Sequence, residues 1–324
     1  MQFVLLLVAL ALKSATAQDL HFSRYYATPL YTNPALAGTG ECSRLMMAYR
    51  NHWPSVSGGF LSYALEADHH FESLKSSVGA QIWHDVAGGV LKTTYASGIY
   101  AYRLQVAELW QVQAGLETGY IFRTIDWGGL VFPDMIDPVS GAVNPSLSGQ
   151  PVPANTSKGS IDFSGGLLAG YNEKIFFGVA VHHFTRPDLS WYSDGSGYLE
   201  RRYTFHGGAN LLLGNAVSGN GSELVLSPNV LYLWQQHARQ LSAGINLTRK
   251  PLELGIAYRN NLGGSDAVTV VAGLVTKRWR LGYAYDYTVS AMSKNTGGSH
   301  EVTMMLLIGC GKRNRPGAIK CPEF

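Results

Sequence analysis

The chain has 324 residues, of which 46% are hydrophobic and 15% are charged, and its formal net charge is +3. The high apolar content and small net charge exclude intrinsic disorder. Apart from its first residues, the chain has no apolar run near the roughly 18 residues that a transmembrane helix needs, which excludes a helical membrane protein. A β-rich protein remains, either a large soluble domain or a membrane β-barrel.

The first residues have the pattern of a signal peptide. Phe3–Leu12 is apolar, and Ala15-Thr16-Ala17 matches an A-x-A cleavage site. We therefore expect residues 1–17 to be a signal peptide and the mature chain to begin at Gln18, outside the cytoplasm. A buried first helix is the alternative.

Residues 18–41 form a distinct segment before the first predicted strand. The segment is too rich in proline and glycine to span a membrane, yet Tyr25, Leu30 and Tyr31 give it an apolar surface that needs cover. We hypothesise that it is a plug in the periplasmic mouth of a barrel, with Asn33-Pro34 in a turn. A flexible leader is the alternative.

From about residue 42 onward, side chains alternate with the period of two that a β-strand produces. In Trp279–Val289, aromatic and aliphatic residues share one face, whereas Arg280, Gly282, Ala284 and Asp286 share the other. A soluble sheet usually has lysine, glutamate and threonine on its second face. Small and polar residues on one face with apolar residues on the other are instead typical of a barrel wall that faces lipid.

Fourteen such segments predict an all-β fold, a transmembrane outer-membrane β-barrel of about 14 antiparallel strands, with 12 or 16 as alternatives. The barrel is expected over residues 42–310, and a basic periplasmic tail over 311–324. The predicted strands are 42–53, 59–71, 76–85, 92–104, 109–124, 160–172, 174–185, 202–214, 223–235, 239–249, 251–260, 266–276, 279–289 and 300–310.

The lengths of the connections predict the orientation of the barrel. The two longest, 125–159 and 186–201, follow the fifth and seventh strands and so lie at the same end. Because outer-membrane barrels have short periplasmic turns and longer external loops, we expect both outside the cell. Binding residues concentrate on long loops, so these two are the best candidates for external contacts.

Alternation also points charged side chains into the lumen. Structural ion pairs across the lumen are favoured over a transport pathway for this set. Its members are Glu117, Arg123, Asp162, Glu253, Arg259, Arg280 and Asp286.

Three cysteines allow one disulfide in an exported protein. In a closed barrel the first and last strands are neighbours, so Cys42 and Cys310 lie at the same rim, near disulfide distance if the register allows. We favour the competing Cys310–Cys321 pairing, because a disulfide between paired strands requires a particular register. Three reduced thiols are a further alternative.

Ten histidines raise the question of catalysis. His84-Asp85 and His182-His183 are the candidates near the outer rim. In each pair one member is expected to face the lumen and the other lipid or the interface, so no catalytic set can be assembled. We predict no enzyme activity, no metal site, no cofactor and no binding of nucleic acid. Paired glycines such as Gly165-Gly166 are expected to mark strand bends and close packing.

The most specific motif follows the signal peptide. It reads Gln18-Asp19-Leu20-His21-Phe22-Ser23-Arg24-Tyr25-Tyr26, then Pro29-Leu30-Tyr31-Thr32-Asn33-Pro34-Ala35-Leu36-Ala37-Gly38, and later Tyr49-Arg50-Asn51-His52-Trp53-Pro54. With the length, the signal peptide and the cysteine-bearing tail, it resembles the PorP/SprF family of type IX secretion system membrane proteins of Bacteroidota. Leu20, Arg24 and His52 depart from the family pattern, which usually has Pro, Gln and Gln there. The motif positions that carry the resemblance are Phe22, Tyr25, Tyr26, Pro29, Leu30, Tyr31, Asn33, Pro34, Gly38, Tyr49, Arg50, Trp53 and Pro54.

The resemblance implies a non-enzymatic component of a machine that exports cargo bearing C-terminal sorting domains. Such a barrel would act in secretion or surface anchoring of cargo of the gliding-adhesin or virulence-factor type. The implied partners are outer-membrane lipids, periplasmic secretion-ring or peptidoglycan-binding subunits, and the cargo itself. The alternative function with the same fold is an outer-membrane diffusion or uptake channel for small or hydrophobic solutes.

Overall fold

A computed structural model describes residues 19–40, 42–172, 174–192, 197–213, 223–262, 264–289 and 296–309. The predicted signal peptide and basic tail lie outside these residues. The strands are β1 Ser43–His52, β2 Phe60–Phe71, β3 Ser76–Ala87, β4 Leu91–Gln105, β5 Trp110–Ile125, β6 Ser157–Tyr171, β7 Ile175–His182, β8 Arg202–Ala209, β9 Leu211–Leu213, β10 Leu224–Gln235, β11 Ala238–Arg249, β12 Leu252–Asn261, β13 Gly264–Val275, β14 Trp279–Thr288 and β15 Ser299–Ile308. Short helical turns are η1 Tyr25–Ala27, α2 Pro29–Thr32, η2 Pro34–Leu36, η3 Glu72–Leu74, η4 Trp127–Gly129, η5 Pro133–Met135 and η6 Pro145–Leu147.

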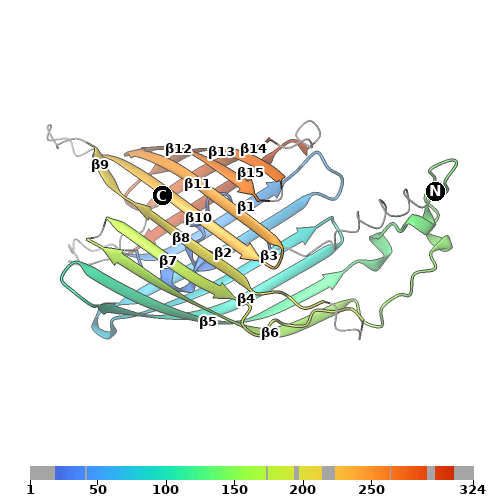
Figure 1. The fold of residues 1–324 in the computed structure, drawn as a ribbon, viewed down its shortest axis with the longest axis horizontal. Coiled ribbons are helices and arrows are strands. Elements are labelled where there is room, and N and C mark those ends of the chain that lie inside the picture. The colour runs from blue at the N-terminus through green and yellow to red at the C-terminus, as the bar shows by residue number, and fades with distance from the viewer. Residues whose placement is uncertain are drawn as a thin grey trace, which may run out of the picture.

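The strands form one closed antiparallel barrel of 14 positions (Figure 1). Neighbours in the chain pair around the sheet, and β15 pairs with β1 from Ser43↔Ile308 to His52↔Ser299. The predicted all-β barrel and its strand number are confirmed. No helix within the described ranges has the length and apolar character needed to cross a membrane.

The described residues form 15 strands for 14 positions in the barrel, because β8 and β9 share one position. Asn229↔Gly208 and Leu226↔Leu211 belong to the same register along β10. The break is at Asn210, whose N–H donates to the carbonyl of Lys174 at 2.7 Å. In that register Pro228 lies opposite Ala209, and its missing N–H removes one hydrogen bond of the ladder.

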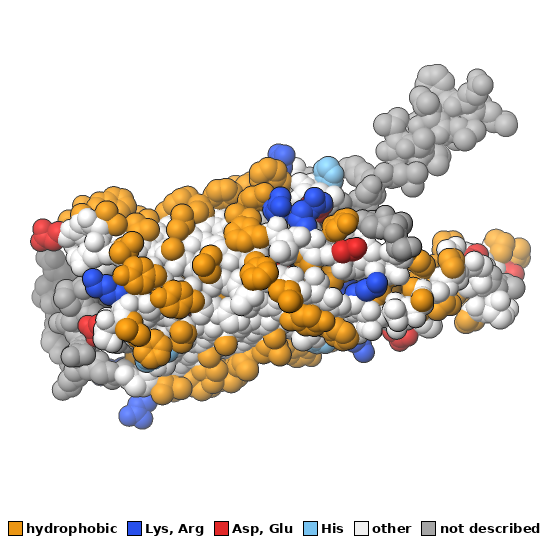
Figure 2. Space-filling model, turned by 90° about the horizontal axis from the view of Figure 1, so that it is seen from below, with side chains coloured by type: hydrophobic (Ala, Val, Ile, Leu, Met, Phe, Trp, Pro, Cys, Tyr) orange, Lys and Arg blue, Asp and Glu red, His pale blue; other side chains and the backbone are white. Residues whose placement is uncertain are grey.

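The two faces of the wall follow the predicted alternation. Along β14, Trp279 and Tyr283 are exposed outward, whereas Arg280 and Asp286 are buried on the inner side. On the face shown in Figure 2, hydrophobic side chains cover the middle of the barrel and charged ones lie toward its ends. This is the arrangement of a barrel that presents its outer wall to lipid.

The two long connections lie at one end of the barrel. Residues 126–156 extend beyond the strands (Figure 1), and we call them the long-loop extension. Residues 183–192 and 197–201 differ from a purely external loop, because Leu189 and Leu199 are 2% and 3% exposed and pack with Phe22 and Trp83. This loop therefore folds into the mouth of the barrel.

The predicted seventh strand was too long. β7 ends at His182, because His183 has a φ of 61°, in the left-handed region that interrupts strand alternation. As a result His182 and His183 are both buried, at 3% and 5% exposure. The prediction that one of them faces lipid or the interface was wrong for this pair.

Residues 19–40, which we call the lumen segment, lie inside the barrel. Asp19 contacts His183 and Arg202 at the long-loop end. Gly38 contacts Asp68 and Arg103 at the opposite end. The segment thus runs the length of the lumen, further than the predicted position in one mouth.

Candidate functional site

The lumen segment is a chain of turns whose backbone groups need partners from the wall. Pro29 and Pro34 each start a helical turn, where a missing N–H costs nothing. Asn33 joins the turns: its N–H donates to the carbonyl of Pro29, and its side chain accepts from the N–H of Ala35 at 2.8 Å. Turns this short satisfy few of their own groups, so inward side chains of the strands must supply the rest.

At the long-loop end, Asp19 lies in a cluster of charges. Its carboxylate is 2.9 Å from Nε2 of His183 and 3.1 Å from Arg202, and Nδ1 of His183 is 2.5 Å from Asp162. Burial disfavours the charged forms of both Asp19 and His183. For Asp19, the positive charges of His183 and Arg202 outweigh burial and hold its pKa well below the ordinary value. Asp19 and Asp162 likewise overcome burial and raise the pKa of His183 to about 9. The pair is therefore charged at neutral pH.

The next contacts form a buried network of ion pairs. Arg50 bridges Asp286 at 2.7 Å and Glu301 at 3.1 Å, and Arg259 reaches Asp286 at 3.0 Å. The lumen segment enters this network through Ser23, whose N–H donates to Glu301 at 2.7 Å and whose hydroxyl donates to Asp286 at 2.6 Å. The wall charges thus neutralise one another, and Ser23 of the segment adds hydrogen bonds to both carboxylates.

Arg24, where the family pattern usually has Gln, is 2% exposed. Its guanidinium donates to both carboxylate oxygens of Glu253, at 2.9 and 3.0 Å. Its N–H donates to Glu301 at 3.0 Å. Both bonds to Glu253 come from one nitrogen, Nη2, while Nη1 donates to the hydroxyl of Thr303, so charge-assisted and neutral hydrogen bonds together fix the side chain.

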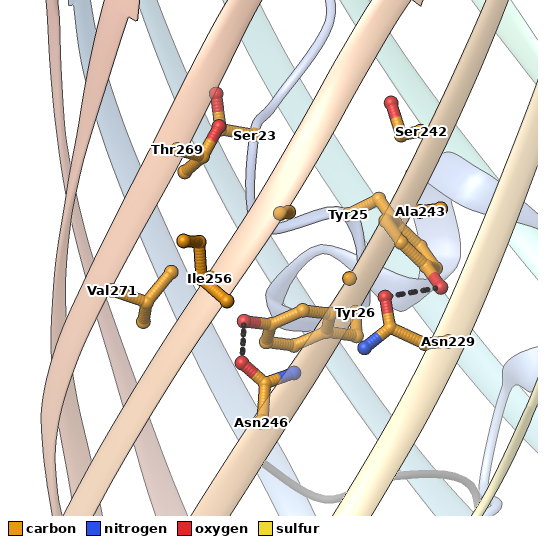
Figure 3. A pocket seen from close by; sticks show the side chains of 12 residues that line it. Ser23, Tyr25, Tyr26, Asn229, Ser242, Ala243, Asn246, Ile256, Thr269 and Val271 are labelled. Atoms are coloured by element: carbon orange, nitrogen blue, oxygen red, sulfur yellow. Dashed lines mark hydrogen bonds between the residues drawn. The ribbon is translucent and has the colours of Figure 1, made fainter.

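Two tyrosines join the segment to the strands on the β10–β13 side (Figure 3). The hydroxyl of Tyr25 donates to Asn229 at 3.1 Å, and that of Tyr26 donates to Asn246 at 3.2 Å. Burial raises the pKa of Tyr26 to about 12, so its hydroxyl stays neutral. Small side chains such as Ser242 leave a narrow cavity beside them.

In the middle of the lumen, Glu66 and Asn33 hold the turns. The Glu66 carboxylate accepts the N–H groups of Leu30 and Tyr31 at 3.0 and 3.1 Å. The Asn33 side-chain amide donates to the carbonyls of Leu167 and Val179, both at 3.2 Å. These bonds satisfy backbone groups on the segment and on the wall together.

At the opposite end, side chains of the wall again bind the backbone of the segment. Gln113 donates to the carbonyls of Ala35 and Ala37 at 2.9 and 2.6 Å. Asp68 accepts the N–H of Gly38 at 2.8 Å and pairs with Arg44. The segment is therefore anchored along its whole length.

Glycines in the wall make room for the segment. A Cβ at Gly115 would lie 2.5 Å from the carbonyl carbon of Pro34. A Cβ at Gly166 would collide with the Asn33 side chain, and one at Gly282 with the Arg24 guanidinium. These glycines allow close approach of a second chain segment, which is more specific than the predicted strand bends.

The family motif is largely explained by the lumen segment. Its members up to Gly38 pack inside the barrel, and Phe22, Leu30 and Asn33 are at most 3% exposed. In the later part, Arg50 joins the ion-pair network, whereas Tyr49 is 37% exposed on the outer face. Trp53 has a φ of 59° in the connection after β1.

All the predicted lumen charges lie on inward positions. Asp162, Glu253, Arg259 and Asp286 belong to the clusters described above. Glu117 accepts from Gln81 and Ser97, both at 2.6 Å. Arg123 donates to Thr93 at 3.2 Å, and Arg280 is 9% exposed.

Alternation predicted some of the inward residues that hold the lumen segment and missed others. Alternation alone could have added Arg44, Glu66, Asp68, Gln113 and Glu301, because each occupies an inward position of its strand. No such signal exists for Asp19, since it precedes the first strand.

Cys42 is disulfide-bonded. Its partner must be Cys310 or Cys321, both outside the described residues. Only one disulfide can form among three cysteines, so a bonded Cys42 is incompatible with the favoured Cys310–Cys321 pairing. The Cys42–Cys310 pairing stays a prediction.

In the structure, the members of the two candidate pairs, His84-Asp85 and His182-His183, each contact separate partners. His84 is 2.8 Å from the hydroxyl of Thr94, while Asp85 accepts from Ser62 at 2.5 Å. His182 contacts the carbonyl of Thr32 at 3.3 Å, and His183 joins the Asp19 cluster. Within the described ranges, no three His, Cys, Asp or Glu side chains are grouped to hold a metal ion.

A family model described as type IX secretion system membrane protein PorP/SprF matches residues 14–306. No curated protein matches the sequence. Among solved structures, Acinetobacter baumannii outer membrane protein Omp33 has a TM-score of 0.45 at 9% identity, over 82% of this chain and 97% of its own. The Ralstonia pickettii toluene transporter TbuX has a TM-score of 0.46 at 10% identity, over 86% of this chain and 91% of its own.

Gly115→Ala tests the close approach of the lumen segment. The added methyl group meets the backbone of Pro34, so we expect a loss of about 1–3 kcal/mol in the free energy of unfolding. Gly98→Ala is the matched control, because nothing lies within 4 Å of its Cβ position. Urea unfolding in detergent micelles measures both, and equal stabilities would contradict the packing of the segment.

Asp19→Asn tests the charge pair at the long-loop end. Burial then lowers the pKa of His183 with one fewer carboxylate to oppose it, so we expect it to fall from about 9 toward its ordinary value near 6.5. A raised pKa stabilises the fold fully below about pH 6.5 and loses that contribution as pH rises through about 9. NMR titration of labelled histidines measures the shift. Asp137→Asn, in an exposed loop, should leave it unchanged, and an unshifted His183 in Asp19→Asn would refute the pairing.

Proposed function

The chain belongs to the PorP/SprF family of type IX secretion system membrane proteins, and on that premise we propose that it serves the export or surface anchoring of cargo bearing C-terminal sorting domains. It is an outer-membrane β-barrel. In this role it is a non-enzymatic partner that joins periplasmic secretion subunits to cargo at the cell surface. Cargo of the gliding-adhesin or virulence-factor type fits the family.

The observation that carries this proposal is the occupied lumen. Residues 19–40 run from one end of the barrel to the other, and their contacts include buried ion pairs such as Arg24–Glu253. Withdrawing the segment would break these ion pairs and hydrogen bonds, so the occupied lumen is the favoured state. A barrel filled in this way supports a role in binding rather than in conducting cargo through its own lumen.

The same observation weighs against the alternative, a diffusion or uptake channel. Such a channel requires a continuous path for a solute. Two observations count against such a path: the cavity beside Tyr25 and Tyr26 is small, and Asn33 of the lumen segment binds the wall carbonyls of Leu167 and Val179. A binding partner needs only the rims and loops.

Deletion of residues 18–38 tests whether the segment closes the barrel. We expect the unaltered protein to show little steady conductance in planar bilayers, and the deletion variant to show discrete openings. Heat-modifiable migration on gels verifies that the variant is a folded barrel. Equal conductance of the two folded proteins would contradict the plug.

Affinity purification from the native outer membrane tests the function itself. We expect mass spectrometry to identify secretion subunits or proteins with C-terminal sorting domains. An unrelated barrel from the same membrane, carrying the same tag, is the control. If neither class is enriched over this control, the proposed function is wrong.

A further inference from the structure

Short turns connect the strands at the end of the barrel opposite the long loops, and their charge differs from one side to the other. Residues 72–75 and 172–174, between β2 and β3 and between β6 and β7, each contain one acid and one base. Residues 249–251 and 276–278, at the β11–β12 and β13–β14 turns, contain four bases and no acid. We call these four bases the basic rim: Arg249, Lys250, Lys277 and Arg278.

The two turns of the basic rim lie side by side. The N–H of Val275, at the end of β13, donates to the carbonyl of Pro251 at 2.7 Å. Leu252 and Leu274 are partners in the register beside this bond. The four bases therefore belong to one cluster on the β11–β14 side of the wall.

The fold of the second turn keeps its bases in solvent. The hydroxyl of Thr276 accepts the N–H of Trp279 at 3.0 Å and donates to the Trp279 carbonyl at 2.6 Å. Lys277 and Arg278 thus occupy the tip of a closed turn. All four bases of the rim are exposed.

The basic rim has no counter-charge from the protein. No acidic side chain in the described part of the chain forms an ion pair with any of the four bases. Glu223 precedes Leu224, the register partner of Arg249, but it too forms no such pair. Neighbouring like charges repel one another, so an anion that binds among them is attracted by each.

The position of the cluster indicates which anion it meets. Arg249 continues the outward row of Ile245 and Leu247, which are 48% and 38% exposed. Leu252 and Trp279, also outward, are 57% and 38% exposed. On a barrel wall such residues face lipid, and a tryptophan at the end of a strand lies at the level of the headgroups. A basic side chain on this row reaches lipid phosphate groups while its stem stays on apolar surface.

We propose that the basic rim binds the phosphate groups of an anionic phospholipid, such as phosphatidylglycerol. On the predicted orientation, with the long loops outside the cell, this lipid belongs to the periplasmic leaflet. It binds against the β11–β14 side, because the other short turns lack the excess of positive charge. The inference does not depend on the proposed role in secretion, since it uses only the contact of the wall with lipid.

Native mass spectrometry of the full-length protein in detergent tests the site. The probes are phosphatidylglycerol, which has a net negative charge, and phosphatidylethanolamine, which has none. We expect phosphatidylglycerol to bind more tightly. Its advantage should fall as ionic strength rises, because salt screens exposed charges.

Charge-removing variants locate the site on the barrel. The double variant Lys277→Gln, Arg278→Gln should bind phosphatidylglycerol about 25-fold more weakly, at about fivefold for each basic residue near an anionic lipid. The double variant Lys75→Gln, Lys174→Gln removes the same charge from other turns at the same end, and it should bind as the unaltered protein does. Lys277→Arg, Arg278→Lys keeps both charges and should retain binding. Heat-modifiable migration shows that each variant is folded.

Three outcomes overturn the proposal. The first is equal affinity for the two lipids. The second is an equal loss of affinity in the basic-rim variant and in the Lys75, Lys174 control. The third is unchanged lipid binding in the basic-rim variant together with loss of a periplasmic protein from the affinity purification, which makes the rim a contact for an acidic protein instead.

Discussion

The structure depends on the need to fill a lumen with satisfied polar groups. Barrels of about eight strands are filled by their own side chains, and those of about 16–18 leave an aqueous channel. At 14 positions this barrel is filled by its own N-terminal residues. The ion pairs of Arg24, Arg50 and Asp286 and the glycine at 115 have a common physical origin: two chain segments must meet closely, away from bulk water, without unpaired charge.

The need to fill the lumen explains most of the family motif. Most motif residues contact the wall from inside the barrel, so the motif is explained by the packing of the lumen segment. β7 ends where residues 183–192 turn toward the lumen, because His183 contacts Asp162 and Asp19 instead of continuing the strand. The same contact that anchors the lumen segment therefore sets the end of β7.

The strands were predictable because their cause is local. A wall with lipid on one side and a polar lumen on the other imposes a period of two, which the Trp279–Val289 pattern already displays. The break at Asn210 was harder to predict from the sequence, since it lies beside Pro228 on the neighbouring strand. The end of β7 was missed because His183 leaves the strand conformation to reach two carboxylates far away in the chain.

The amino-acid sequence by itself determined the barrel, its approximate strand number, the inward position of the charges and the resemblance to a secretion family. These follow from local alternation and a contiguous motif. The tertiary structure alone decided where residues 19–40 lie, which charges pair and where β7 ends. Those features depend on contacts between residues such as Arg24 and Glu253, which are far apart in the chain and are brought together by barrel closure.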